Sequence, residues 1–424
     1  MNYLNASKDE LKKEYKALLK TYEDYKGKGL SLNMARGKPS TAQLDASMHL
    51  LDCIESGTEC KAEDGTDCRN YGVLEGIEEC KVIMAEMMDV EPDNVFVGGN
   101  SSLNMMFDTI SCFMTAPIYE DTKPWYEVKN RKFLCPVPGY DRHFGITGYF
   151  GFEMIPIPMD ENGPDMDMVE KLVAEDDSIK GIWCVPKYSN PSGITYSDET
   201  VKRLAGLKPA AKDFRIMWDD AYAIHDVTDT PDHLISIAAE VNKNGNEDIV
   251  IIFCSTSKIT FPGSGVAAMA ASKLNMRVLK NRYLYSTIGY DKMNMLRHVK
   301  FFGNFDGLKK HMEKHKAILA PKFNTVLSKL KSELSESNIA KWTNPNGGYF
   351  VSVDVFDGTA KRVVQLCKEA GVVLTGAGAT YPNGNDPHDS NIRIAPSFPN
   401  VDELSVAMDI FCVCSKLAAL EKLI

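Results

Sequence analysis

Between about residues 80 and 300, short apolar runs alternate along the chain with longer segments whose apolar residues recur at helical spacing. This alternation predicts strand–helix–strand units, which assemble into a mainly parallel sheet with helices on both faces. The runs are almost wholly apolar, as expected for strands that are covered on both sides. The predicted strands are 95–97, 132–137, 152–157, 181–185, 214–218 and 249–254, and the intervening helices include 101–114, 166–174 and 198–207.

The pattern of the sequence changes after about residue 300. Ser7 and Glu10 form a capping-box pattern that starts a helix near the N-terminus, and Gly27 can end that helix. These patterns predict an α/β fold with a large domain up to about residue 300 and a smaller α+β domain after it. In the C-terminal stretch we expect helices at 307–334 and 401–423 and strands at 348–355, 372–374 and 391–394.

Composition and charge argue against several classes of protein. The chain has 424 residues, a net charge of −10 and no basic stripe, so nucleic acid is not expected as a partner. Charged residues begin at Lys8, too early for a signal peptide, and no apolar run approaches the roughly 20 residues that a membrane helix needs. The eleven cysteines include no CxxC pair, so we expect reduced thiols and assign none to a metal. The sequence therefore predicts a soluble, cytoplasmic protein that does not contact a membrane.

Polar residues gather where several of the predicted strands end. They form four short clusters, at 98–102, 190–193, 219–222 and 255–258. In open α/β sheets, ligands bind beyond the carboxyl ends of the strands. We therefore expect the four clusters to meet in one site, and this shared placement carries more weight than any single motif.

Lys258 and Asp219 are the residues in these clusters that best suit chemistry. Lys258 follows an apolar run, where burial would lower its pKa and favour Schiff-base formation; the alternative is a strand-end lysine whose charge reaches solvent. Asp219 also ends an apolar run, and a buried carboxylate needs a cationic or hydrogen-bonding partner; the alternative is a capping residue in a loop. Asp220 should point to the opposite side if the strand continues.

Each remaining candidate also has a plain structural explanation. Asn190, in Asn-Pro-Ser-Gly, can supply a hydrogen-bonding amide or be part of a simple turn. Residues 98–102 combine glycines with a helix start, which binds phosphate but also caps ordinary helices. Tyr140 can stack on a flat ring or pack in the core. Arg393, in an apolar strand pattern, can hold a carboxylate or form a structural salt bridge.

Taken in order, these residues resemble the fold type I pyridoxal-phosphate (PLP) enzymes, specifically class I/II aminotransferases. The likeness runs from about residue 30 to residue 400 and rests on an ordered set of motifs: Asn190-Pro-x-Gly, Asp219-x-x-Tyr222 and Ser257-Lys258. The intervals are 29 residues from Asn190 to Asp219 and 39 from Asp219 to Lys258, similar to those of the family. The resemblance implies a PLP-transferase fold, with a large domain at 51–300 and a small domain formed by 1–50 and 301–424. It also implies a homodimer with the active site at its interface, and ping-pong amino transfer between an amino acid and a 2-oxo acid.

The resemblance also implies roles for individual residues. Lys258 would hold the cofactor as a Schiff base and shuttle protons, and Asp219 would pair with the pyridinium nitrogen. Gly37 would lie beside the substrate, and Arg393 would clamp its α-carboxylate. The other implied cofactor contacts are Tyr222 and Asn190 at the ring hydroxyl, Tyr140 stacked on the ring, Ser257 beside the lysine, Asn100, Ser101, Ser102 and Ser255 at the phosphate, and Tyr71 reaching the phosphate of the partner subunit.

One loop departs from the family pattern. The family usually has an arginine about eight residues after the lysine, in Gly-x-Arg-x-Gly, and this arginine contacts the phosphate. Here residues 261–266 read Phe-Pro-Gly-Ser-Gly-Val, so Ser264 is expected to substitute as a neutral donor, with more of the phosphate charge facing the helix start. This loop and the segment 34–40, Met-Ala-Arg-Gly-Lys-Pro-Ser, are similar to a divergent aspartate aminotransferase subgroup, often called type Ic.

That narrower likeness predicts aspartate and 2-oxoglutarate as substrates. Both are dicarboxylates, so a second cation besides Arg393 must bind the distal carboxylate. Three arginines are candidates for this role: Arg36, Arg142 and Arg297. Arg142 is favoured because Tyr140 would set its loop beside the cofactor. The alternatives are an aminotransferase for alanine or aromatic donors and a C–S β-lyase on the same fold. A non-enzymatic PLP-binding regulator is not expected, because the residues before the likeness leave no room for a DNA-binding module.

Overall fold

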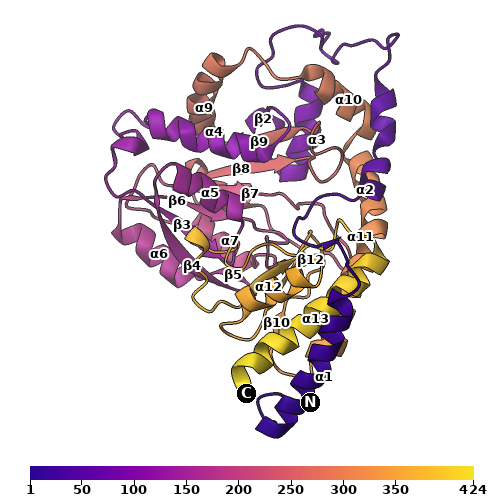
Figure 1. Cartoon of the computed structure of the whole chain (residues 1–424). Helices are drawn as coiled ribbons and strands as arrows, with labels where there is room; N and C mark the ends of the chain where they lie inside the picture. Colours follow the sequence, from indigo (N-terminus) through magenta and orange to yellow (C-terminus); the bar gives the residue numbers. More distant parts are fainter.

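The computed structural model describes all 424 residues and is built around an eight-stranded sheet (Figure 1). The strands lie in the order β2-β9-β8-β7-β6-β3-β4-β5, and the run from β8 to β4 is parallel throughout. Only β9 and β5 run against their neighbours. The predicted α/β architecture with a mainly parallel sheet is therefore confirmed. The strands are β2 (Val95–Val97), β3 (Lys132–Val137), β4 (Glu153–Asp160), β5 (Gly163–Pro164), β6 (Ile179–Cys184), β7 (Arg215–Asp219), β8 (Val250–Ser255) and β9 (Ala267–Ala271).

Helices cover both faces of this sheet, so its central strands contribute to two cores. On β7, Ile216 and Trp218 lie in one core and Met217 lies in the other. This alternation explains why the strand sequences are apolar throughout. The helices that follow or precede these strands are α3 (Glu78–Met88), α4 (Ser102–Thr115), α5 (Asp141–Tyr149), α6 (Met166–Glu175), α7 (Asp198–Ala205), α8 (Ile237–Lys243), α9 (Lys273–Ser286) and α10 (Lys292–Phe302).

Strand β9 is absent from the sequence prediction. Its sequence is Ala-Ala-Met-Ala-Ala, and alanine favours helices and is depleted in strands. All five residues are nevertheless buried between β8 and β2, so pairing on both edges outweighs the local preference. The strands predicted from apolar runs are all present, with ends displaced by a few residues at most.

The rest of the chain brings its two ends together in a second packed region (Figure 1). Helix α1 lies along α13, and β1 pairs in parallel with β12. Strands β10, β11 and β13 form a small antiparallel sheet beside them. The elements are α1 (Lys8–Lys26), β1 (Leu32–Asn33), α2 (Thr41–Asp45), α11 (Phe305–Leu334), β10 (Lys341–Trp342), β11 (Val351–Asp354), α12 (Ala360–Glu369), β12 (Val372–Val373), β13 (Asn391–Ile394) and α13 (Val401–Leu423).

Helix α11 joins the two regions. Its first turns place Leu308 and Met312 in a core of the large sheet, while Leu319 and Phe323 pack in the second region. The capping box predicted for α1 is present, because Ser7 and Glu10 bond each other's main-chain N–H groups. This arrangement leaves the carboxyl ends of β6, β7 and β8 facing residues from both ends of the chain.

Three further properties of the chain follow from the structure. None of its helices combines the length and the apolar character needed to cross a membrane. All eleven cysteines are free thiols. No three His, Cys, Asp or Glu side chains come together in an arrangement that could hold a metal ion.

Candidate active site

A cavity of about 470 Å³ opens at the carboxyl ends of the central strands. Its walls come from the turns after β6, β7 and β8, the starts of α4 and α5, the segment 35–38 and strand β13. This is the edge at which the sequence predicted the polar clusters to meet. The predicted residues that line the cavity are Gly37, Ser101, Ser102, Tyr140, Arg142, Asn190, Asp219, Tyr222, Ser255, Ser257, Lys258 and Arg393.

Lys258 reaches this cavity from the turn that follows β8. Its Nζ lies 4.8 Å from the centre of the Tyr222 ring. Burial lowers the pKa of Lys258, and the nearby carboxylate of Asp219 opposes part of that shift. A lowered pKa increases the fraction of neutral amine, which is the form that attacks a carbonyl carbon.

Asp219 has one oxygen held by the protein and one oxygen free. Its Oδ2 lies 3.0 Å from Nε2 of His143, whereas Oδ1 is buried and has no hydrogen-bond partner. Leaving a buried carboxylate oxygen unpaired is unfavourable unless a donor or a cation completes it. Asp219 therefore offers one open position to a donor in the cavity.

His143, which the sequence analysis did not single out, fixes Asp219 from behind. Its ring stacks on Trp183, with ring centres 4.2 Å apart. The indole of Trp183 donates to Oγ1 of Thr147 at 2.8 Å, and that hydroxyl donates to the carbonyl of His143 at 2.7 Å. His143 follows Tyr140 by three residues at the start of α5, so the two share a face of the helix, but nothing in the sequence marks His143 as a partner of Asp219.

Asp220 is also buried, but it does not line the cavity. This agrees with the expectation that consecutive side chains at the end of β7 point to opposite sides. Burial raises the pKa of Asp220 to about 7, with Lys187 lowering it and Asp219 raising it. At neutral pH Asp220 is therefore only partly ionised, and only Asp219 presents an unpaired oxygen to the cavity.

Arg393 enters the cavity from β13 and is 7% exposed. Its Nη1 donates to Oδ1 of Asn190 at 3.1 Å and to Oδ1 of Asp141 at 3.3 Å, and its Nη2 donates to Oγ1 of Thr375 at 3.3 Å. Its Nε is buried without a partner. The guanidinium is thus held in place yet retains an unused donor, as a binding site for a carboxylate requires.

Gly37 is required by close packing beside Arg393. The ring of Phe350 lies 4.7 Å from the guanidinium carbon of Arg393. A Cβ on Gly37 would come within 2.3 Å of Cζ of that ring, closer than any side chain can tolerate. The glycine predicted to lie beside the substrate therefore keeps this side of the cavity open.

The start of α4 forms the opposite wall. Ser101 is the N-cap residue and Ser102 begins the helix, whose first N–H groups lack intrahelical partners. The hydroxyl of Ser255 donates to that of Ser257 at 3.0 Å, and Ser257 donates to the carbonyl of Asn100 at 3.3 Å. Hydroxyls and N–H groups thus converge at a helix N-terminus, where an anion is stabilised.

Several predicted residues lie outside the cavity lining. Asn100 donates to the carbonyls of Pro262 and Gly263, and Oγ of Ser264 accepts from Nη2 of Arg297 at 2.7 Å. Of the three arginines considered for a distal carboxylate, Arg36 and Arg142 line the cavity as exposed side chains, and Arg297 does not.

Tyr71 also stands apart from the cavity of its own chain. It is 81% exposed, on a loop that Lys292 holds by donating to the carbonyls of Asn70 and Gly72 at 2.7 and 2.8 Å. Ile288, also exposed, follows α9 just before Gly289, which packs closely on Gly72.

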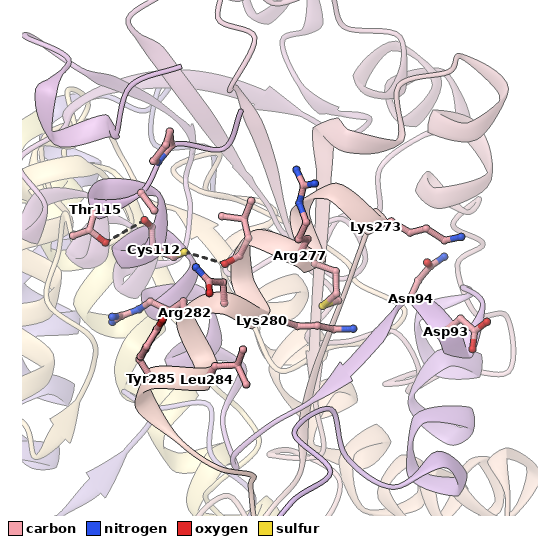
Figure 2. Close-up of a pocket in the computed structure, with 15 residues that line it drawn as sticks. Asp93, Asn94, Cys112, Thr115, Lys273, Arg277, Lys280, Arg282, Leu284 and Tyr285 are labelled. Atoms are coloured by element: carbon pink, nitrogen blue, oxygen red, sulfur yellow. Dashed lines mark hydrogen bonds between the residues drawn. The ribbon is translucent and has the colours of Figure 1, made fainter. Parts of the chain in front are cut away.

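A larger cavity, of about 860 Å³, lies elsewhere, between the end of α4 and helix α9 (Figure 2). It is lined by basic side chains of α9, among them Lys273, Arg277 and Lys280. Lys280 already pairs with Glu75. This cavity contains none of the predicted site residues, so the smaller one is the candidate active site.

Comparison with known proteins shows which family the chain belongs to. The family model described as aspartate amino-transferase matches residues 6–424. An aspartate aminotransferase of Corynebacterium glutamicum is 48% identical over 400 residues, which cover 94% of this chain and 92% of that protein. The chain belongs to the aspartate aminotransferase family. It is a PLP-dependent aminotransferase, as the motifs predicted.

Solved structures show how closely the fold of this aminotransferase is shared. The crystal structure of an aspartate transaminase from Corynebacterium glutamicum superposes with a TM-score of 0.97 at 45% identity, over 100% of both chains. That of a putative aminotransferase from Corynebacterium diphtheriae gives a TM-score of 0.93 at 49% identity, over 96% of this chain and 100% of that one.

Proposed function

We propose that this aminotransferase transfers the amino group of aspartate to 2-oxoglutarate, with PLP bound between β7, β8 and the start of α4. The observation that carries the proposal is the pair formed by Lys258 and Asp219. The first lines the cavity with an amine whose pKa is lowered, and the second with a buried, unpartnered oxygen. PLP needs both partners: an amine for its aldehyde carbon and an anion for its ring nitrogen.

The residues present fit the cofactor in charge and in donor chemistry. Oδ1 of Asp219 would pair with the pyridinium N–H, and Tyr222 and Asn190 would bind the ring hydroxyl O3′. Tyr140 would lie against the ring. The phosphate would meet Ser101, Ser102, Ser255 and Ser257 at the start of α4, with Asn100 and Ser264 supporting the loops behind them.

When bound, PLP withdraws electrons from the Cα of the substrate and so makes the Cα proton removable. Lys258 would supply the amine that holds the cofactor and that the amino group of the substrate would replace. Its free amine would then serve as general base and general acid for the Cα proton. Arg393 holds the α-carboxylate, and Gly37 leaves room for it beside Phe350.

A dicarboxylate substrate needs a second cation, and the exposed arginines of the cavity can supply it. Arg36 and Arg142 both line the cavity, and a guanidinium binds a carboxylate through two parallel hydrogen bonds. We favour Arg142, because it follows Tyr140 at the start of α5. The aspartate aminotransferase and the aspartate transaminase of Corynebacterium glutamicum support the choice of aspartate.

We also propose that the enzyme acts as a homodimer in the cytoplasm, with residues 1–50 and 301–424 forming a small domain around the large domain at 51–300. An exposed tyrosine on a firmly held loop is suited to reach a second copy, where Tyr71 would meet the phosphate. Eleven free cysteines are compatible with a reducing compartment.

Borohydride reduction tests the cofactor site directly. Reduction of the yellow holoenzyme, followed by peptide mapping, should locate the phosphopyridoxyl group on Lys258. Lys38 is the sharpest competitor, because it lines the same cavity with its ammonium over the ring of Phe398. A label on Lys38 or on any other lysine would refute the assignment.

Subunit complementation tests the dimer. Dimers of Tyr71→Phe and of Lys258→Ala should recover activity when their subunits exchange, because one hybrid site is then free of both substitutions. If exchange is demonstrated and activity does not recover, Tyr71 does not act across the interface.

A further inference from the structure

A chain of buried polar side chains runs behind the turn that carries Lys258. It consists of Tyr349, Gln43, His315, His311 and Ser47, each at most 5% exposed. None of them lines the cavity. Buried polar groups are retained in a core when each finds a hydrogen-bond partner, so their partners indicate what the chain of residues holds.

At one end, Tyr349 holds the main chain of Lys258. Its hydroxyl donates to the carbonyl oxygen of Lys258 at 3.1 Å and accepts from Nε2 of Gln43 at 2.8 Å. The orientation of Gln43 is fixed, because its Oε1 accepts from the main-chain N–H of Ser40 at 3.1 Å. Burial raises the pKa of Tyr349, so the hydroxyl keeps the proton that it donates.

At the other end, two histidines lie beside the next carbonyl, which Ser47 holds. Nε2 of Gln43 lies 3.1 Å from Nδ1 of His315, so this nitrogen accepts and the ring carries its proton on Nε2. That Nε2 lies 3.2 Å from Nε2 of His311, which therefore accepts and does not donate to the carbonyl oxygen of Ile259, 3.0 Å away. The hydroxyl of Ser47 donates to the same carbonyl at 3.2 Å.

Both rings stay neutral near neutral pH. Burial lowers the pKa of His311, and it lowers that of His315 to about 4, with the charge of His311 adding to the effect. The network is therefore an uncharged set of donors and acceptors that grips two consecutive carbonyls. Because the main chain that directly follows the Lys258 side chain is held at two carbonyls, fewer directions remain open to its amine.

We propose that Tyr349, Gln43 and His315 are positioning residues, which hold the main chain of Lys258 and Ile259 so that the lysine amine meets the Cα proton of the substrate in reactive geometry. This inference rests on the role proposed for Lys258. It assigns a function in catalysis to residues that touch neither substrate nor cofactor.

The same segments also form the substrate side of the cavity. Tyr349 directly precedes Phe350, whose ring lies against Arg393, and Gln43 follows the segment 35–38 that lines the cavity. The hydrogen bonds of Arg393 go to Asn190, Asp141 and Thr375, none of which belongs to the network. Loss of the network should therefore slow proton transfer with little effect on the KM for the amino acid.

The test compares the holoenzymes of Tyr349→Phe and of a matched control, Tyr283→Phe. Tyr283 is equally buried, but its hydroxyl has no hydrogen-bond partner. The readouts are the pKa of the visible absorption band without substrate and the isotope effect on kcat with a donor deuterated at Cα. For Tyr349→Phe we expect kcat to fall roughly 3- to 10-fold, a larger isotope effect and a band pKa moved by roughly half a unit to one unit. The control should match the wild type.

A second variant tests whether the effect comes from the network or only from the substitution at Tyr349. Gln43→Leu leaves both Tyr349 and His315 without their partner, so it should change the band pKa and the isotope effect in the same direction. If Tyr349→Phe lowers the Tm while both readouts keep their wild-type values, the network supports stability alone and the inference is wrong. Borohydride labelling at Lys258 separates the two claims, because a label elsewhere overturns the proposed function instead.

Discussion

The two walls of the active-site cavity are built on different principles. On the cofactor wall, Asp219 is buried and held by His143, and the carbonyl of Lys258 is held by Tyr349. On the substrate wall, Arg36 and Arg142 are exposed side chains that form no ion pair within the chain.

The difference separates reaction type from substrate choice. Charges that are fixed in advance stabilise a transition state without reorganising when it forms, so the buried wall commits the protein to one kind of chemistry. Exposed arginines lose side-chain freedom when they bind a ligand, and they can be replaced without disturbing the core. We therefore expect substitutions in the first wall to abolish the reaction and substitutions in the second to redirect it.

The largest effect is expected at the centre of the cofactor wall. Lys258→Ala removes the amine and the proton shuttle together, and the proton-transfer role alone accounts for roughly 10²- to 10⁴-fold. Steady-state kcat with aspartate and 2-oxoglutarate measures the loss. A variant that keeps more than a tenth of the wild-type kcat would show that another base serves the reaction. The residues of the cofactor wall would then not determine the reaction type.

The next effect distinguishes two adjacent aspartates on the cofactor wall. Asp219→Ala removes the anion that faces the cavity, and loss of one member of a buried charged pair lowers kcat by roughly 10²- to 10³-fold. Asp220→Ala is the matched control, because Asp220 is buried one residue away without lining the cavity. Similar rates for the two variants would contradict the assignment of Asp219 to the ring nitrogen.

The two walls also differ in how well their residues could be predicted from the sequence. The clusters after β6, β7 and β8 were predictable because strand ends in a parallel sheet meet at one edge and because their residue types are specific for the chemistry. The role of His143 could not be predicted, because a single histidine in a helix gives no sign that it stacks on Trp183 behind Asp219. The network from Tyr349 to His311 joins residues far apart in the chain, and only packing reveals it.

Other features could not be predicted because the local sequence does not indicate them. Strand β9 has a helix-like composition and owes its conformation to pairing on both edges. The sequence does not distinguish one exposed arginine from another. It therefore left Arg36, Arg142 and Arg297 as three candidates for binding the distal carboxylate. The geometry separates Arg297, which bonds Ser264, from the two that line the cavity.

A smaller and more selective effect is expected on the substrate wall. Removing the cation that binds the distal carboxylate should lower kcat/KM for aspartate by roughly 10- to 100-fold, since the arginine is exposed before the substrate binds. The kcat/KM for alanine, which has no distal carboxylate, should hardly change. A donor panel on Arg36→Ala, Arg142→Ala and the control Arg297→Ala measures this. A wild type that strongly prefers alanine or an aromatic donor would rule out the dicarboxylate proposal and leave the aminotransferase assignment intact.

The smallest effect is on stability, and it examines the charge of Asp220. Burial raises the pKa of this carboxyl from 3.8 to about 7 in the folded protein. Below pH 4 it is neutral in both states, so folding is unaffected. Between about pH 4 and 7 the unfolded chain loses the proton first, so the free energy of unfolding falls as the pH rises. Above pH 7 the loss of stability that Asp220 causes is constant.

Asp220→Asn cannot titrate, so its free energy of unfolding relative to the wild type should rise between pH 4 and 7 and then level off. Urea unfolding at a series of pH values measures this difference. If it stays flat across the range, Asp220 is ionised in the folded protein like any surface acid, and burial does not raise its pKa.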